Sequence, residues 1–170
     1  KVAIFKPEMD NRWGSVNKVR SHSGHEAEAA PIKKPKDILK FISKHTKLVA
    51  IDEVQFFDES ILTVIERLVG ANIEVIAAGL PLDFRGEPFG SMPTLLAKAD
   101  TIYKVTAICT YKNNGEICGK EATRTQRLVD GKPAAYRDRV ILVGAKESYA
   151  ARCPTHHIVL GKPKPKASHP

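Results

Sequence analysis

Short apolar runs alternate with amphipathic stretches over the first two thirds of the chain. Apolar runs of strand length predict buried strands, and apolar residues at helical spacing predict helices between them. This alternation predicts an α/β fold with a mostly parallel sheet that helices cover on both faces. The expected strands are Val2–Phe5, Leu48–Ile51, Ile73–Ala78 and Ile102–Ala107, and the expected helices run over about 37–42, 61–69 and 94–99, the second ending at Gly70.

The remaining segments divide the chain further. The polar stretch from Lys6 to about Lys36 predicts a long loop. After Cys109 the chain becomes richer in arginine, glycine and short alternating stretches, and it carries all three cysteines. We therefore expect an α/β core over residues 1–107, a small second domain over 108–160, and a disordered, basic, proline-rich tail over 161–170.

Composition narrows the class of protein. The 170 residues are 42% hydrophobic, and no apolar run approaches the ~20 residues that span a bilayer, so no membrane association is expected. The net charge of +8 indicates an anionic partner. An odd number of cysteines argues against a disulfide framework and predicts a reducing, cytoplasmic location. The chain starts abruptly at Lys1, without a signal segment, so we expect further residues before it in the full-length protein.

Two adjacent acids, Asp52 and Glu53, follow the apolar run Leu48–Ile51 directly. Ligands gather at the carboxyl ends of parallel strands, and a hydrophobic strand that ends in Asp is the Walker B pattern, whose carboxylate holds Mg²⁺ near phosphates. An adjacent Glu can accept a proton from a nucleophilic hydroxyl group. The simpler alternative is a solvated strand end, and this pattern alone does not decide between the two.

A phosphate-binding loop of the form G-x-x-x-x-G-K-[ST] would support the Walker B interpretation, but the sequence does not contain one. The first strand of this chain would be the second strand of a P-loop fold, so the loop is expected before Lys1.

The segment "GLPLDFRGEPFG", residues 79–90, could form a pocket in which Phe84 and Phe89 enclose a flat base. A glycine-rich turn anchored by two core phenylalanines is the alternative.

The second domain contains candidate metal ligands. "CPTHH" supplies Cys153 and His156 as a Cys-x-x-His pair, and Cys109 and Cys118 would form the other pair, with eight residues between them. This gap exceeds the usual spacing of about two to four residues. Three cysteines and one histidine make a closed tetrahedral zinc site, which is structural rather than catalytic. The alternative is three unrelated thiols and a surface histidine pair.

Several motifs together resemble the thymidine kinases of the cellular, type II family. They are "FKPEMDNR", "SHSG", "IDEVQFF", "GLPLDFRGEPFG", "ATRTQRL" and "VGAKESYAARC", in the family's order from Val2 to about His157. The resemblance implies ATP-dependent phosphorylation of thymidine or deoxyuridine at the 5′-hydroxyl group. It also implies a P-loop NTPase-like core, a zinc-ribbon or lasso domain that closes over the nucleoside, a homotetramer, and dTTP as a possible feedback ligand.

The resemblance also assigns roles to individual residues. It implies that Glu53 is the general base and that Asp52 is associated with Mg²⁺ and ATP. Asp10 and Arg12 match positions near the phosphates and the metal. The nucleoside-binding positions it implies are Phe56, Leu80, Phe84, Phe89, Thr125, Val140, Leu142, Val143 and Tyr149, with Arg127 in the same strand as Thr125.

The sequence departs from the family pattern in three places. The phosphate-binding loop is missing, Pro81 stands where the family usually has Asp, and "CTYKNNGEIC" carries an insertion where the family usually has Cys-x-x-Cys. Two other classes stay open at this point. One is a zinc-ribbon nucleic-acid-binding protein, which would need basic residues interleaved with exposed aromatic residues. The tyrosines are too scattered to form such a surface, so no nucleic-acid partner is expected. The other class is a P-loop ATPase that is not a kinase.

Overall fold

The structure of the protein is a computed structural model that describes residues 1–8, 18–20, 26–141 and 147–164. The chain forms two compact units. The first unit contains Lys1–Pro81 and Pro88–Thr101, and the second contains Leu82–Glu87 and Ile102–Pro170. A short loop of the first half of the chain therefore belongs with the second half.

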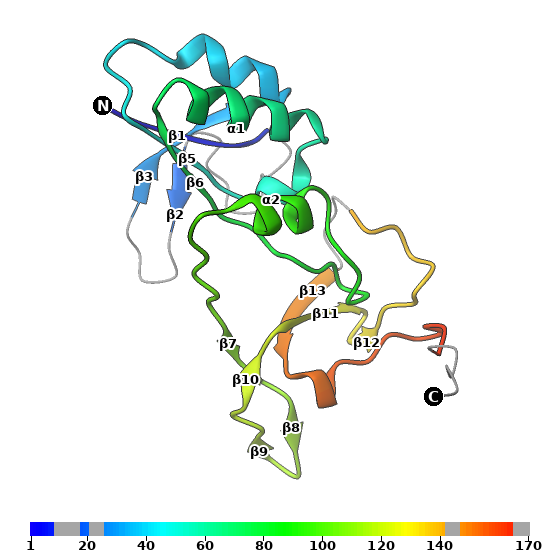
Figure 1. Ribbon diagram of the computed structural model, residues 1–170. Coiled ribbons are helices and arrows are strands. Elements are labelled where there is room, and N and C mark those ends of the chain that lie inside the picture. Colours follow the sequence, from blue (N-terminus) through cyan, green and yellow to red (C-terminus); the bar gives the residue numbers. More distant parts are fainter. Residues whose placement is uncertain (9–17, 21–25, 142–146, 165–170) are drawn as a thin grey trace, which may run out of the picture. The chain divides into compact units, whose positions relative to one another are not determined.

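The first unit is built on a parallel sheet of four strands, as the alternating pattern predicts (Figure 1). The strands are β1 (Val2–Pro7), β4 (Ala30–Ile32), β5 (Leu48–Ile51) and β6 (Glu74–Ala77), in the order β4-β1-β5-β6. In the register of β1 and β5, Phe5 lies opposite Ile51. The carboxyl ends of these two central strands therefore meet at one edge of the sheet.

Helices flank this sheet, and the α/β prediction is confirmed. They are η1 (Pro35–Phe41), η2 (Val54–Phe56), α1 (Ser60–Gly70) and α2 (Met92–Lys98). The predicted helix over 37–42 is a 3₁₀ helix, and no side chain caps it at Lys34. The predicted end of α1 at Gly70 is confirmed, and Asn72 takes the left-handed conformation two residues later, with φ of 59°.

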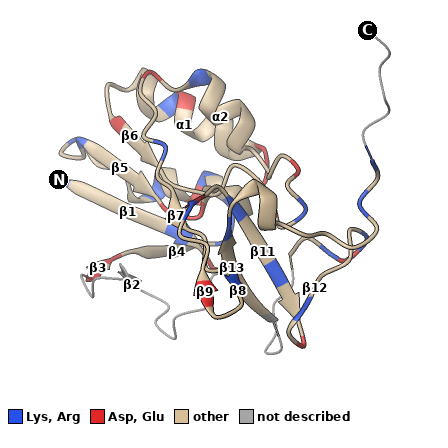
Figure 2. Cartoon of the chain, turned by 90° about the horizontal axis from the view of Figure 1, so that it is seen from below, with Lys and Arg blue, Asp and Glu red and all other residues tan. Residues whose placement is uncertain are grey.

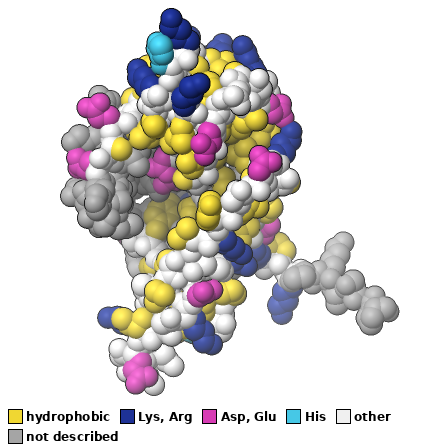
Figure 3. All heavy atoms as spheres, turned by 60° about the vertical axis from the view of Figure 1, so that its left-hand side comes forward, with side chains coloured by type: hydrophobic (Ala, Val, Ile, Leu, Met, Phe, Trp, Pro, Cys, Tyr) yellow, Lys and Arg dark blue, Asp and Glu magenta, His cyan; other side chains and the backbone are white. Residues whose placement is uncertain are grey.

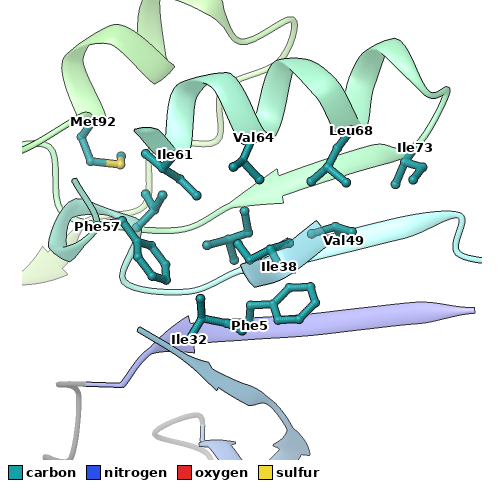
Figure 4. Close-up of a cluster of buried hydrophobic side chains, with 12 residues drawn as sticks. Phe5, Ile32, Ile38, Val49, Phe57, Ile61, Val64, Leu68, Ile73 and Met92 are labelled. Atoms are coloured by element: carbon teal, nitrogen blue, oxygen red, sulfur yellow. The ribbon is translucent and has the colours of Figure 1, made fainter. Parts of the chain in front are cut away.

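The core of the first unit lies between the sheet and the helices (Figure 4). In α1 the buried residues Ile61, Val64 and Leu68 are spaced three and four apart, which places them on one face of the helix. Figure 4 shows this face above Val49 of β5 and Phe5 of β1. Burial of these side chains is the main force that fixes β5, and hence the position of the acids that follow it.

The long loop predicted from Lys6 to Lys36 is only partly correct. It contains β4 and an antiparallel pair formed by β2 (Lys18–Arg20) and β3 (Glu26–Glu28). The strands are three residues long, so their apolar pattern is too short to be recognised against the polar residues around them.

The second unit contains short antiparallel strands. Its largest sheet has the order β12-β11-β13, with β11 (Arg124–Val129), β12 (Lys132–Pro133) and β13 (Glu147–Arg152). Two smaller ladders pair β7 (Ala107–Ile108) with β10 (Glu121–Ala122), and β8 (Lys112–Asn113) with β9 (Glu116–Ile117). The short helix η3 (Pro154–His156) follows β13.

The predicted strand Ile102–Ala107 is wrong for most of its length. Only Ala107 belongs to a strand, and the side chains of Tyr103 and Val105 are 87% and 90% exposed. An apolar run becomes a strand only where a neighbouring strand accepts its hydrogen bonds, and no strand of the described residues pairs with 102–106. Among the described residues, no helix is both long enough and apolar enough to cross a membrane.

Candidate functional site

The two acids predicted at a strand end lie directly after β5. The backbone N–H group of Asp52 donates to the carbonyl of Phe5 at 2.9 Å, so Asp52 still follows the register of the sheet. Glu53 then turns away, with φ of 49° and ψ of 40°, and its N–H group donates to the Asp52 carboxylate at 2.9 Å. A left-handed glutamate is uncommon and unfavourable, and such conformations gather at functional sites.

Gln55 connects this turn to the glycine-rich segment that follows β6. Its side chain is 2% exposed. The amide nitrogen donates to the Glu53 carboxylate, and the amide oxygen accepts the N–H group of Leu80 at 3.1 Å. Because a backbone N–H group can only donate, the oxygen must face Leu80 and the nitrogen must face Glu53. Gln55 therefore fixes the direction of the Glu53 carboxylate.

Two glycines make room for Gln55. A Cβ atom on Gly79 would lie 2.4 Å from the Gln55 amide oxygen, and one on Gly90 would lie 2.4 Å from the Gln55 carbonyl oxygen. Gly90 also has φ of 51°, which favours glycine. Gln55 lies inside the motif "IDEVQFF", but its contact with residues near Gly79 and Gly90 could not be predicted from the sequence.

The aromatic residues predicted around a base fall into both units. Phe56 and Phe89 lie in the first unit, where their rings meet edge to face with centroids 5.5 Å apart. Leu80 is in the same unit and is 41% exposed. Phe84 is buried in the second unit. Of the predicted magnesium and phosphate residues, Asp10 and Arg12 lie outside the described residues.

The second unit brings together the four predicted metal ligands, Cys109, Cys118, Cys153 and His156. Their ligand atoms all lie within 4.8 Å of one another. The His156 Nδ1 atom is 3.4 Å from the Cys153 sulfur and 3.7 Å from the Cys109 sulfur. Tyr111 stacks on the His156 ring with centroids 4.1 Å apart. Three sulfurs and one imidazole nitrogen at these distances fit a tetrahedral zinc ion, since a single ion could contact all four.

The electrostatics of the cluster also suit a metal. Burial raises the pKa of the Cys109 thiol, but the backbone at Cys153 and Tyr111 and the side chain of His156 lower it to about 6. The backbone at Lys120 lowers the pKa of Cys118, but burial and the neighbouring sulfurs outweigh it, and the net shift is upward. Neighbouring thiolates repel one another, so one thiol ionises readily and the next one less readily. A bound cation removes this repulsion and stabilises the sulfurs as thiolates.

The unusual spacing between Cys109 and Cys118 is taken up by a hairpin. Strands β8 and β9 pair across Asn114 and Gly115, both with positive φ. At the base of the hairpin, Cys118 donates its N–H group to the carbonyl of Tyr111 at 2.8 Å. The insertion therefore projects from the metal cluster and leaves both sulfurs in place.

His157 is not part of the cluster. Its Nε2 atom lies 2.8 Å from the carbonyl oxygen of Phe84. Burial and the positive charges of Arg124 and Lys162 lower the pKa of His157, which favours the neutral ring. The two neighbouring histidines therefore differ in role: His156 faces the sulfurs, and His157 fixes the loop that carries Phe84.

Strand β11 carries the predicted residues Thr125 and Arg127 two positions apart, hence on one face of the strand. Thr125 is half-buried and Tyr149 of β13, opposite Arg127, is 47% exposed. Val140 is half-buried, and Leu142 and Val143 lie outside the described residues. On the opposite face of β11, Gln126 exchanges two hydrogen bonds of 2.8 Å with the backbone of Ile158.

Figure 2 shows Lys and Arg residues scattered over many elements, including β11. On the face in Figure 3, basic side chains gather at one end beside a histidine, and acidic side chains are interspersed elsewhere. Both signs of charge are therefore present on this face.

The family model described as thymidine kinase matches residues 1–157 of this chain. The match includes the acids after β5, the glycine-rich segment after β6 and all four residues of the metal cluster.

Proposed function

The chain belongs to the thymidine kinase family, and from this premise we propose that it transfers the γ-phosphoryl group of ATP to the 5′-hydroxyl group of thymidine. Deoxyuridine, which lacks only the methyl group of thymine, is the proposed second substrate. The observation that carries this proposal is the arrangement of Glu53 and Asp52 at the end of β5, with the Glu53 carboxylate held by Gln55.

In this proposal Glu53 accepts the proton of the 5′-hydroxyl group as that oxygen attacks the γ-phosphorus, and the bond from the γ-phosphorus to the β,γ-bridging oxygen breaks, so that ADP leaves. Asp52, with Asp10 and Arg12, would hold Mg²⁺ and the phosphates. Bound Mg²⁺ neutralises the charge on the phosphate oxygens, and positioning supplies most of the remaining catalysis in phosphoryl transfer.

The nucleoside would be bound by apolar walls and by backbone groups. Polar edges of a buried base must be paired, because an unsatisfied polar group costs ~1–3 kcal/mol. The side chains of Val140, Leu142 and Val143 offer no polar atoms, so we propose that their backbone groups pair with the base. Thr125 would lie beside the thymine methyl group, and the packing residues would be Phe56, Leu80, Phe84, Phe89 and Tyr149.

The cluster of three cysteines and His156 would hold one structural zinc ion. A closed site with four protein ligands leaves no position for a substrate, so the ion would stabilise the second unit rather than take part in the reaction. We also propose, from the resemblance of the sequence motifs, a homotetramer in the cytoplasm that serves nucleotide salvage for DNA synthesis, with dTTP as a feedback ligand.

The test is a kinase assay on the full-length protein with labelled thymidine, deoxyuridine and deoxycytidine. We expect thymidine and deoxyuridine to be phosphorylated, and Glu53→Gln to lower kcat by ~10²–10⁴ while thymidine still binds. Near-normal kcat in Glu53→Gln would remove Glu53 from the role of base. A thermal shift with oligonucleotides but not with nucleosides would favour a nucleic-acid-binding protein instead.

A further inference from the structure

We infer that Arg127 is a positioning residue for nucleoside binding, which holds the ring of Phe84 and the backbone of Arg139 and Val140 in one fixed arrangement. The inference rests on the proposed function, because the importance of these groups comes from their proposed contacts with the nucleoside. All the groups involved belong to the second unit.

Arg127 is fully buried, with 0% of its surface exposed. The guanidinium carbon lies 3.8 Å from the centroid of the Phe84 ring. The Nη1 atom donates to the carbonyl of Arg139 at 2.6 Å and lies 3.4 Å from that of Val140. A flat cation with several donors can stack on a ring and bind carbonyls in its plane at the same time. No other common side chain has this combination.

Phe84 and Arg139 come from distant parts of the sequence. Phe84 lies in the loop Leu82–Glu87, and Arg139 and Val140 precede the proposed base-pairing backbone. The Asp138 carboxylate lies 3.8 Å from Arg127 and accepts the N–H group of Ala135 at 2.8 Å, so the turn before Arg139 is also tied to this charge. One side chain therefore determines the spacing between a proposed wall of the site and its proposed polar contacts.

A purely structural role makes a different prediction. Replacing a buried charged residue by an apolar one of similar size can leave stability unchanged or raise it. Under that interpretation, the thymidine affinity of the folded protein would not change. Under ours, the affinity falls even where the protein is folded and retains its zinc.

Arg124 provides a matched control on the same strand. Its side chain points to the opposite face of β11, and its hydrogen bonds go to the carbonyl and the hydroxyl group of the neighbouring Thr123, at 3.1 and 3.0 Å. Arg124 also lies near Gly86, in the loop that carries Phe84. Arg124→Met therefore removes the same charge from the same strand and from beside the same loop, but leaves the contacts of Arg127 with Phe84, Arg139 and Val140 in place.

The experiment measures the Kd for thymidine by calorimetry, zinc content and Tm for the full-length wild type, Arg127→Met, Arg127→Lys and Arg124→Met. We expect Arg127→Met to retain one zinc per chain and to bind thymidine at least tenfold more weakly, about 1.4 kcal/mol. Arg127→Lys, which keeps the charge but not the planar fork, should fall between wild type and Arg127→Met. Arg124→Met should stay within twofold of wild type.

Kinetics separate positioning from catalysis. If Arg127 acts through binding alone, Arg127→Met should raise KM for thymidine and leave kcat at saturation nearly unchanged. A wild-type Kd in folded Arg127→Met would overturn the inference, whatever the change in Tm. If Arg127→Met does not fold, a wild-type Kd in Arg127→Lys would overturn it. Failure of the wild type itself to bind thymidine would instead refute the proposed function.

Discussion

Replacing Gln55 with Met removes both hydrogen bonds of a buried amide while keeping the length of the side chain. The Glu53 carboxylate loses its donor, and the N–H group of Leu80 loses its acceptor. We expect this change to lower both stability and kcat, and to lower kcat only through Glu53.

The size of the stability effect follows from the two bonds. A buried N–H group left without a partner costs ~1–3 kcal/mol, and a hydrogen bond to a charged group is worth ~1.5–3 kcal/mol. Glu53 is half-buried and Leu80 is 41% exposed, so the lower part of both ranges applies. The sum is about 3 kcal/mol. For a chain of this length, 1 kcal/mol lowers Tm by ~2–4 °C, so Gln55→Met should melt about 6–12 °C lower than wild type.

The catalytic effect is tested by a double-mutant cycle on kcat in the full-length enzyme. Loss of a general base costs ~10²–10⁴ in rate, which sets the upper limit for losing its orientation. In the Glu53→Gln background there is no base left to orient, so adding Gln55→Met should change kcat less than twofold. Fully additive losses would refute the reasoning, because they would show that Gln55 acts independently of Glu53. Unchanged kcat in the single variant would refute it too.

The remaining predictions concern the metal, one glycine and the backbone of the proposed nucleoside site. Elemental analysis should find one zinc per chain, and this zinc should be lost in His156→Ala and retained in His157→Gln. If only His157→Gln lost the zinc, the ligand would be His157 and not His156. Chelation should lower both Tm and thymidine affinity, measured by thermal shift with and without nucleoside. Gly90→Ala, which adds a Cβ 2.4 Å from the Gln55 carbonyl at a φ of 51°, should destabilise by about 3 kcal/mol in urea titrations, whereas Gly131→Ala, with open space around its Cβ, should lose only the backbone strain of its positive φ. Leu142→Ala should weaken thymidine binding modestly and Leu142→Pro severely, because proline removes an N–H group; equal effects would argue against recognition by the backbone.

The parts of the fold that depend on burial could be predicted from the sequence. Val49 and Ile51 of β5, and Ile61, Val64 and Leu68 of α1, are buried as their spacing indicates. The run Ile102–Ala107 shows the limit of this reasoning. Hydrophobicity predicts that a segment tends to be buried, but a strand also needs a partner, and sequence spacing does not say which one.

The residues that orient the site were harder to predict. Glu53 and Asp52 have a recognisable pattern because both the strand and the acids are local in sequence. Gln55 and Arg127 act on groups 25 and 12 to 13 residues away, and Arg127 also on Phe84. Such contacts leave no periodic signal. The local indications are a glutamine beside two phenylalanines in "IDEVQFF" and the glycines of "GLPLDFRGEPFG".

The insertion between Cys109 and Cys118 shows how a departure from a spacing rule can be compatible with the same metal site. The usual spacing of zinc ligands corresponds to a short turn that brings two sulfurs together. A longer segment between the two ligands needs a structure of its own that brings its ends close together. Here that structure is a hairpin: Asn-Gly at 114–115 is the preferred pair for a tight turn in which both residues have positive φ, and both do. The pairing of β8 with β9 then brings the two ends together, and the N–H group of Gly119 reaches the carbonyl of Cys109 at 3.3 Å. Because Gly115 has φ of 88°, replacing it with a β-branched residue should disturb the pairing of β8 with β9 and, through it, the position of Cys118.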